Sequence, residues 1–460
     1  MNLKVCISLI FTIVLYQGCG SSSNSEPIVV ENDAEDYSNT QWYKTYNEEF
    51  YSANGISQNA NITPDSIYTE YKGSGVKIAI IDDGFDTTHP ELQNRIYKTI
   101  NTTNFGLDND VSHSSNEDYH GTAVAGIIAA NDNGYGITGI APKAELILIK
   151  MASFSTDLET IEMFQKAVDA GAWVINCSWG TGDVSDTVRS YINYIANTAR
   201  DGKGVVVVFA SGNGNHLMSN DESAIESVVG VGATDHNALR STYSDYGPDL
   251  DVVAPGGGEY YGDYGISTID PIGSLGISNN DYNLYSEVNN GFEVSFIGTS
   301  ASAPIVSASI ALMLEANPNL TREEIQYLLR ETSDKIGMYL PYIENNIVIN
   351  DSTPMFQGSL GSTNSTDFKL KLTLNNSNIY KLYTVSIDGN NWFVEIQEEL
   401  EEGFYKAELL LSSDNQVLAT DSLFEINHSK TALSYGSRND FYGYGKINLA
   451  KLIEGSLKVQ

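Results

Sequence analysis

The sequence predicts an α/β fold in which a doubly wound, mostly parallel sheet carries a small antiparallel β insertion. Strands buried on both faces of a parallel sheet are continuous apolar runs, and such runs occupy 76–81, 146–150, 173–178 and 205–210. Helical spacing at 121–130 and 158–170 separates these runs, and alternating strands and helices imply right-handed crossovers. Further along, 368–374 alternates strictly between apolar and polar residues, which is typical of a half-buried antiparallel strand.

Local signals predict where several elements begin or end. Gly171 closes the helix at 158–170 as a C-cap, and Thr321 and Glu324 form a capping box that opens a helix to about Thr332. Ser300 would begin a long apolar helix that continues through 305–314. In the insertion, further strands are expected at 383–387, 392–396, 409–411 and 422–426, with a hairpin turn at 388–391.

The charge balance is strongly acidic. Among the 460 residues, 25 are Lys or Arg and 59 are Asp or Glu, which gives a formal net charge of −34. Such a surface repels nucleic-acid phosphates and anionic lipids, so we expect no nucleic-acid partner. The three cysteines, Cys6, Cys19 and Cys177, cannot build a disulfide framework, so the fold must depend on its buried core.

The first 18 residues have one early charge and an apolar run too short to span a bilayer, which predicts an export signal peptide. Gly18-Cys19 and the small polar residues that follow resemble a bacterial lipoprotein processing site, with Cys19 as the lipidation site. Tyr16 stands where such sites usually have leucine, so simple secretion is the alternative. We expect an exported monomer, anchored by lipid at the outer membrane or cell surface, or else periplasmic or secreted. Residues 19–40 would form a flexible tether, and the membrane would be contacted only through the anchor.

Three short segments suggest a catalytic chemistry, in the chain order Asp82, His120, Ser300. They are 80–84, 120–122 and 298–304, each with a glycine. A serine hydroxyl needs a neighbouring base to attack a carbonyl, and an imidazole that titrates near pH ~6.5 can take and return that proton. Asp82, at the end of a buried strand, would orient His120, whereas the alternative acid Asp83 is expected to be a polar turn residue. Ser300 would meet unpaired N–H groups at the start of its helix.

These segments, together with 178–180, 210–214 and a closing stretch at 439–445, resemble the subtilase superfamily of serine endopeptidases, and their flanks resemble its kexin-like branch. The resemblance implies a subtilisin-like fold and hydrolysis of peptide bonds through an acyl-enzyme on Ser300. It therefore implies that the substrates are proteins or peptides. It also implies that the amide of Asn213 donates to the oxyanion. The alternative is an inactive subtilase scaffold that acts as a cell-surface binding module.

The resemblance further implies a substrate site between two segments that pair with an extended peptide. These segments are Ser178, Trp179 and Gly180 on one side and Ala210, Ser211 and Gly212 on the other. Kexin-like relatives prefer basic residues and use acidic groups around these pockets. The sequence leaves open whether Asp183, Asp186, Asp221 or Asp245 has that role here.

A structural calcium site is also implied by the resemblance. Its ligands would be the side chains of Glu91 and Asn133 and the backbone carbonyls of Asn131, Tyr135 and Ile137. Glutamate stands where aspartate is more usual, and a plain polar surface loop is the alternative.

The domain organisation that follows has five parts: a signal peptide at 1–18, a tether at 19–40, a catalytic domain at 41–344, an inserted β-rich module at 345–433, and the end of the catalytic domain at 434–460. The histidines other than His120 have no matching catalytic context. We expect His89 to be structural and His113, His216, His236 and His428 to lie at the surface.

Overall fold

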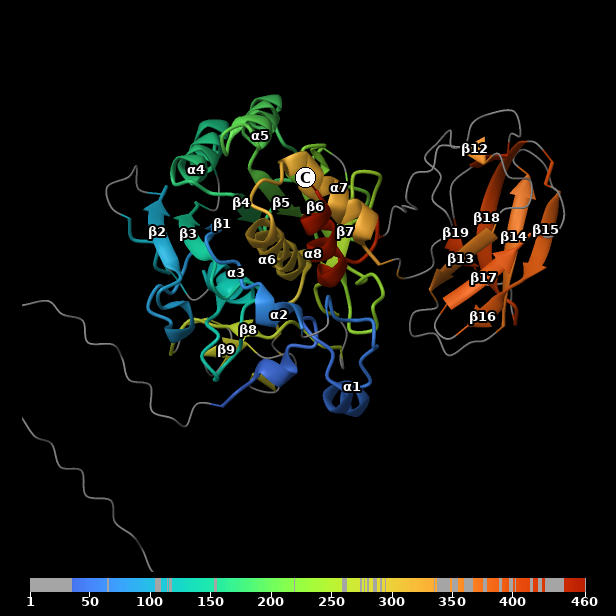
Figure 1. Cartoon of the computed structure of the whole chain (residues 1–460), viewed down its shortest axis with the longest axis horizontal. Helices are drawn as coiled ribbons and strands as arrows, with labels where there is room; N and C mark the ends of the chain where they lie inside the picture. Colours follow the sequence, from blue (N-terminus) through green and yellow to red (C-terminus); the bar gives the residue numbers. More distant parts are fainter. Residues whose placement is uncertain are drawn as a thin grey trace, which may run out of the picture. The chain divides into compact units, whose positions relative to one another are not determined.

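The computed structural model describes residues 35–459, except 64–65, 104–108, 114, 116–117, 153–154, 219, 259–262, 274, 277, 279–280, 284–287, 290–291, 294, 335, 337–347, 350–354, 360–366, 375–378, 389–390, 397–399, 402, 414–416, 421–423 and 427–441. The predicted signal peptide, Cys19 and the first part of the predicted tether therefore lie outside the described residues. Figure 1 shows a sheet flanked by helices and, later in the chain, a set of antiparallel strands.

Seven parallel strands form the central sheet, in the order β2-β3-β1-β4-β5-β6-β7. Their bounds are β1 Lys77–Asp82, β2 Ile96–Asn101, β3 Glu145–Lys150, β4 Val174–Cys177, β5 Val206–Ala210, β6 Val228–Thr234 and β7 Val252–Pro255. The apolar runs correctly predicted β1, β3, β4 and β5. Strands β2, β6 and β7 were not predicted. β2 is an edge strand whose residues Tyr97 and Lys98 are exposed and interrupt the apolar run.

Helices cover both faces of this sheet (Figure 1). α3 (His120–Ala129) and α6 (Thr299–Ala316) contact one face, and α4 (Asp157–Asp169) and α5 (Asp186–Thr198) contact the other. Successive residues of β1 belong in turn to two hydrophobic cores, because successive side chains of a strand point to opposite faces of the sheet. Ile78 and Ile80 join the core with α3 and α6, whereas Ala79 and Ile81 join the core with α4 and α5. The predicted doubly wound α/β sheet is confirmed.

The predicted helix ends are also confirmed. Gly171 has a φ of 84° directly after the C-cap of α4, a conformation that glycine adopts without strain. Thr321 and Glu324 form the capping box of α7 (Arg322–Thr332). Among the described helices, α6 alone has the length and hydropathy of a membrane span, and 83% of that window is buried inside the protein. The shorter elements are η1 Ser38–Thr40, α1 Glu48–Asn54, α2 Ile67–Glu70, η2 Pro90–Leu92, η3 Glu222–Ala224, β8 Thr268–Ile269, β9 Tyr282–Asn283, β10 Val288–Asn289, β11 Phe292–Glu293 and α8 Leu449–Lys458.

The strand order changes direction at β1. The chain forms β3 on one side of β1 and β4 on the other side. In open α/β sheets, the crevice at such a switch point, outside the carboxyl ends of the strands, is where ligands bind. Asp82 is the last residue of β1, so it lies at this crevice.

The strands between 348 and 426 form two further sheets. One has the order β12-β20-β18-β14-β15, with β19 paired to β18, and the other has the order β13-β17-β16. Their bounds are β12 Val348–Ile349, β13 Met355–Ser359, β14 Phe368–Leu374, β15 Tyr380–Thr384, β16 Ser386–Asp388, β17 Asn391–Glu395, β18 Gly403–Leu411, β19 Val417–Thr420 and β20 Phe424–Ile426. All their pairings are antiparallel except that of β12 with β20.

The alternating pattern predicted β14 correctly, but the single strand predicted at 383–387 is wrong. Its residues belong to two strands of different sheets, β15 and β16, with the buried Val385 between them. Alternation of apolar and polar residues cannot show that a chain leaves one sheet for another. The predicted hairpin after Asp388 agrees with the register of β16 and β17, where Asp388 lies opposite Asn391.

Residues 35–40, the end of the segment that composition predicts to be a tether, are held by backbone hydrogen bonds. The N–H of Gly136 donates to Glu35 O at 2.8 Å, and the N–H of Tyr37 donates to Gly136 O at 2.7 Å. Thr40 then contacts the hydroxyl of Ser267 at 2.8 Å. Composition gives no signal for such main-chain pairing, because every residue type except proline can supply both groups.

Candidate active site

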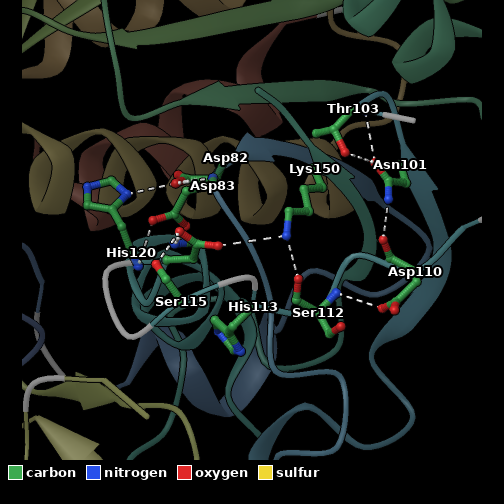
Figure 2. Close-up of polar contacts among 12 residues, drawn as sticks. Asp82, Asp83, Asn101, Thr103, Asp110, Ser112, His113, Ser115, His120 and Lys150 are labelled. Atoms are coloured by element: carbon green, nitrogen blue, oxygen red, sulfur yellow. Dashed lines mark hydrogen bonds and ion pairs between the residues drawn. The ribbon is translucent and has the colours of Figure 1, made fainter. Parts of the chain in front are cut away.

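The hydrogen bond between Asp82 and His120 lies at the crevice beside β1 (Figure 2). Asp82 Oδ1 and His120 Nδ1 are 2.8 Å apart, and the same oxygen accepts the N–H of Asp83 at 2.9 Å. Asp82 is 4% exposed, and its Oδ2 has no hydrogen-bond partner among the described residues. A carboxylate accepts only, so Nδ1 carries the imidazole proton and Nε2 is left as the basic nitrogen.

Opposing effects set the pKa of His120. Burial favours the neutral imidazole and by itself lowers the pKa of His120. The charge and the hydrogen bond of Asp82, together with the charge of Asp83, raise it, and the net pKa lies above the ordinary value. His120 is therefore a stronger base than an unperturbed histidine.

Gly121 allows α3 to start this close to β1. A Cβ atom at Gly121 would lie 2.5 Å from Gly84 O, 2.9 Å from a ring carbon of Phe85 and 3.0 Å from Asp82 Cβ. The nearest of these atoms belongs to the backbone and cannot move aside as a flexible side chain can. Glycine after His120 is therefore a steric condition for the contact between His120 and Asp82.

Ser300 is the second residue of α6 and is connected to the end of β4. Its Oγ donates to Ser178 O at 2.9 Å, and Ser178 Oγ donates back to Ser300 O at 2.9 Å. No hydrogen bond joins Ser300 to His120 within the described part of the chain. The ring of Phe296, four residues before Ser300, packs against the ring of His120 with centroids 5.3 Å apart. This contact brings the start of α6 to the side of His120.

Asn213, in the loop after β5, contacts the residue that precedes Ser300. Asn213 Oδ1 accepts both the N–H and the hydroxyl of Thr299, each at 2.9 Å. The N–H of Gly212 donates to the same hydroxyl at 3.2 Å. Because two donors occupy the amide oxygen, its Nδ2 is the group left to donate, and Nδ2 has no acceptor among the described residues. The amide is thus oriented by the start of α6.

The two segments predicted to bind substrate lie at one edge of the sheet. Residues 178–180 follow β4, Ala210 is the last residue of β5 and residues 211–212 follow it, and these neighbouring strands pair in parallel. Trp179 is fixed there, because its Nε1 donates to Ile81 O at 2.9 Å. Gly180 is exposed and Gly212 is half-buried. The edge therefore presents accessible backbone on both sides.

A buried carboxylate that sequence reasoning missed lies beside this edge. Glu222 is 1% exposed, and it accepts the N–H and the hydroxyl of Thr181 at 3.1 Å and 2.8 Å. The contact joins residues 41 positions apart, so no local pattern could predict it.

The predicted acidic candidates make structural contacts. Asp245 accepts the N–H groups of Gly214 and His216, both at 2.9 Å, and so shapes the loop that follows Asn213. Asp183 accepts Asn220 Nδ2 at 2.7 Å. Asp221 caps η3, and Asp186 begins α5.

The remaining histidines do not join the site. His89 is buried, and its Nδ1 accepts the N–H of Glu91 at 3.1 Å, as expected of a structural residue. The expectation that His236 lies at the surface is wrong, since it is 8% exposed and packs edge-on against Tyr264. His113 is half-buried and contacts a threonine of α3, and His216 is exposed. His428 lies outside the described residues.

Glu91 meets the loop that was predicted to complete a calcium site. Its Oε2 accepts Asn133 Nδ2 at 3.0 Å, and its Oε1 accepts the hydroxyl of Tyr282 at 3.1 Å. Burial raises the pKa of Glu91 to about 8, although these hydrogen bonds and the N–H groups of Ile137 and Asn131 act to lower it. Glu91 is 0% exposed and forms no ion pair with any described Lys, Arg or His.

These residues fit a calcium ion in charge and in ligand type, because a buried carboxylate without a basic partner lies beside amide and carbonyl oxygens. Asn133 Oδ1 instead accepts the N–H of Tyr135 at 3.3 Å, so its amide turns the nitrogen toward Glu91. No group of three or more His, Cys, Asp or Glu side chains suited to a metal occurs among the described residues. A cation here would therefore depend on one carboxylate and neutral oxygens. The contact with Tyr282, 191 positions away, was not predicted.

Comparison with known proteins gives a consistent result. The subtilase family model matches residues 73–370, which is more than half of the chain. A "Calcium-dependent protease" of Trichormus variabilis is 33% identical over 300 residues, covering 61% of this chain and 45% of that protein. A "Thermophilic serine proteinase" of Bacillus sp. (strain AK1) is 32% identical, covering 69% of this chain and 72% of that protein. The chain thus spans about half the length of the first of these relatives.

Solved structures agree on the fold. A protease from Pseudoalteromonas arctica matches with a TM-score of 0.52 and 26% identity, over 65% of this chain and 92% of that chain. A serine protease of Aeromonas sobria, solved with its chaperone, matches with a TM-score of 0.61 over 93% of this chain and 68% of that chain. Its identity of 19% shows likeness of fold alone. The family match, on a doubly wound parallel sheet with these motifs at its carboxyl edge, shows that the chain belongs to the subtilase family.

Proposed function

We propose that this chain is a serine endopeptidase in which Ser300 is the nucleophile, His120 the general base and Asp82 the residue that orients the base. The observation that carries the proposal is the 2.8 Å contact of Asp82 Oδ1 with His120 Nδ1 at the carboxyl end of β1. Family membership supports the class of activity, since the relatives at 33% and 32% identity are named proteases.

The proposed reaction passes through an acyl-enzyme. Ser300 Oγ leaves its hydrogen bond with Ser178 O and attacks the peptide carbonyl carbon, while its proton moves to Nε2 of His120. The tetrahedral intermediate collapses, the C–N bond breaks, and the amine leaves with that proton. Water then attacks the acyl carbon and gives a proton to His120 Nε2; the ester bond to Ser300 breaks, Ser300 Oγ takes that proton, and the carboxylic acid leaves. Asp82 keeps the tautomer and stabilises the imidazolium without taking the proton itself.

The oxyanion would be held by two donors, the N–H of Ser300 and Nδ2 of Asn213. The first lies at the start of α6, where N–H groups have no partner within the helix. The second is supported by the two hydrogen bonds from Thr299, which occupy the amide oxygen and leave its nitrogen to donate. Donors fixed in advance stabilise developing charge without reorganising as the reaction proceeds.

A fluorophosphonate probe tests the nucleophile directly. We expect the probe to label the wild-type protein, with loss of fluoride as the Oγ–P bond forms, and we expect no labelling of Ser300→Ala. Ser302→Ala is the matched control, because Ser302 lies on the same helix but is buried and donates to Ala254 O at 3.0 Å. This control should be labelled as the wild type is.

The competing function, an inactive scaffold that binds partners at the cell surface, gives the opposite result. A folded wild-type protein that neither reacts with the probe nor hydrolyses any peptide would favour the scaffold. Catalysis is the better proposal, because Asp82 orients the imidazole of His120 and Thr299 orients the amide of Asn213. A binding scaffold needs neither group to be oriented.

We also propose that substrates bind as an extended strand between residues 178–180 and 210–212. Exposed Gly180 and half-buried Gly212 leave backbone groups accessible on both sides of the edge. Profiling the cleavage of a peptide library would identify the side chain preferred before the scissile bond. It would also show whether the acidic groups nearby favour basic residues, and whether cleavage is broad or restricted to one sequence.

We propose a structural calcium ion at Glu91, with Asn133 and the carbonyls of Asn131, Tyr135 and Ile137 as the other ligands. Buried Glu91 without a basic partner supports it, as does the relative named "Calcium-dependent protease". The ion would supply the missing positive charge and so stabilise the fold. Calcium at 100 times its dissociation constant would add about 2.7 kcal/mol to the free energy of unfolding. Calcium-dependent thermal melting should show this gain for the wild type and lose it for Glu91→Gln.

Export with lipid attachment at Cys19 is a separate proposal from the sequence. The apolar leader and Gly18-Cys19 support it. Metabolic labelling with an alkynyl fatty acid in a bacterial host should modify the full chain and spare Cys19→Ala. Release of unlabelled protein into the medium would favour simple secretion instead.

A further inference from the structure

Asp83 faces the first turn of α3. Its Oδ2 accepts the N–H of His120 at 3.3 Å, and its Oδ1 accepts the N–H of Gly121 at 2.8 Å. The residue that precedes the helix, Tyr119, makes no side-chain cap of its own. Asp83 therefore supplies the cap from a point 37 positions earlier in the chain, and a carboxylate there also complements the helix dipole.

Two consecutive carboxylates thus act on one histidine through different atoms (Figure 2). Asp82 holds Nδ1 of the His120 ring, and Asp83 holds the backbone N–H of the same residue. We propose that Asp83 is a positioning residue, whose carboxylate fixes the backbone of His120 and adds a second negative charge beside its imidazole. The inference rests on the proposed function, because it assigns His120 the role of a base whose position and charge matter.

The charges around Asp83 agree with this role. Burial raises the pKa of Asp83 to about 7, the charge of Asp82 adds to the rise, and the hydrogen bonds from Gly121 and His120 oppose it. The titratable groups that interact with Asp83 from the surrounding elements are Asp82 at the end of β1 and His120 and Tyr119 at the start of α3.

The ion pair that Lys150 forms in the described part of the chain is with Asp118. Lys150, at the end of β3, lies 3.8 Å from Asp118 Oδ2, and its Nζ donates to Ser112 O at 2.5 Å (Figure 2). When Asp83 is ionised, its negative charge lies beside His120 and favours the protonated imidazole. Removal of that charge should lower the pKa of His120.

Two substitutions separate charge from capping. Asp83→Asn and Asp83→Ser each keep an oxygen that can accept from the helix N–H groups, but carry no charge. Asp83→Ala removes both. The matched control is Asp118→Asn, which removes a carboxylate two residues before His120 that is not among the groups that raise the pKa of His120 and that lies 3.8 Å from Lys150 Nζ.

The first readout needs no enzymatic activity. In a Ser300→Ala background, which excludes self-cleavage, NMR of histidine-labelled full-length protein follows the titration of His120, assigned with His120→Gln. We expect Asp83→Asn and Asp83→Ser to lower the pKa of His120 by about 0.5 to 1 unit, the effect of one nearby charge at intermediate dielectric. Asp118→Asn should shift it by less than about 0.2 unit.

The second readout is the pH profile of kcat/KM. The acidic limb of the profile should move to lower pH by the same amount in Asp83→Asn, and Asp83→Ala should in addition lose about threefold to tenfold in kcat with little change in KM. A merely structural role would lower stability and leave the acidic limb in place.

The outcomes distinguish the two proposals. If neither uncharged variant moves the titration of His120, or if Asp118→Asn moves it equally, the positioning role of Asp83 is overturned. If Asp83→Asn does not fold, Asp83→Ser decides the question by the same titration. If the wild type hydrolyses no peptide and does not react with a fluorophosphonate, the proposed function fails, whereas the titration still reports on Asp83.

Discussion

Replacement of Gly121 by alanine should impair both catalysis and stability. The added Cβ would lie 2.5 Å from Gly84 O, and real Cβ atoms essentially never approach other heavy atoms closer than 3.0 Å. The start of α3 must therefore move away from β1 by at least about 0.5 Å. The contact of His120 Nδ1 with Asp82 Oδ1, now 2.8 Å, would then lengthen beyond an ordinary hydrogen bond.

The expected fall in kcat follows from this displacement. A misplacement of about 1 Å at a reacting group can cost about 100-fold in rate, so we expect kcat to fall about tenfold to 100-fold. Overpacking of this kind usually costs about 1–3 kcal/mol of stability. Steady-state hydrolysis of a peptide substrate measures kcat and KM, and calorimetric melting measures Tm.

A matched control is Gly455→Ala in α8. A Cβ there would meet the tip of the Leu328 side chain at 2.8 Å, which can move aside, and kcat should stay at the wild-type value. If Gly121→Ala keeps kcat within about twofold of the wild type at unchanged Tm, the steric argument for the His-Gly pair is refuted.

Three further predictions concern the oxyanion, a buried lysine and a helix cap. Asn213→Ala should lower kcat about 100-fold to 1000-fold at nearly constant KM, a range taken from subtilisin rather than worked from this structure; an unchanged kcat would remove Asn213 from the oxyanion hole. Lys446 is buried, its Nζ donates to Asn59 O and Asn61 O, and burial lowers its pKa to about 8. Because the unfolded chain keeps this proton up to about pH 10.4, the free energy of unfolding should rise between about pH 8 and 10, and Lys446→Met should abolish that part of the rise in urea titrations. Thr321→Ala should cost about 1 kcal/mol in the same titrations, whereas Thr321→Ser, which keeps the capping oxygen, should cost little.

Much of the α/β region could be predicted because its signals are local. A continuous apolar run such as Val206–Ala210 indicates a strand buried on both faces, and a Thr321–Glu324 pair indicates where a helix begins. Edge strand β2 was missed because the exposed residues Tyr97 and Lys98 interrupt its apolar run, and the β15–β16 boundary was missed because both strands continue the same alternation.

Within the site, motif context predicted the residues but not all of their contacts. The neighbourhood of Asp82 and His120 was predicted, and the structure brings them within hydrogen-bond distance. The cap that Asp83 gives to α3, the hydrogen bond of Tyr282 with Glu91 and the buried Glu222 were not predicted. Each of these contacts joins residues between 37 and 191 positions apart, and no spacing along the chain encodes it.

The sequence by itself determined the alternating strands and helices, the helix caps and the motifs of the subtilase family, since each depends on residues within a few positions of one another. The sequence also predicted that Asp82 rather than Asp83 would orient His120, but only the tertiary structure decided which groups Asp83 contacts. At the end of β1, Asp82 contacts the imidazole of His120, and Asp83 accepts the backbone N–H of the same histidine. That difference depends on where α3 packs, which is set by long-range burial and by the space that Gly121 leaves open.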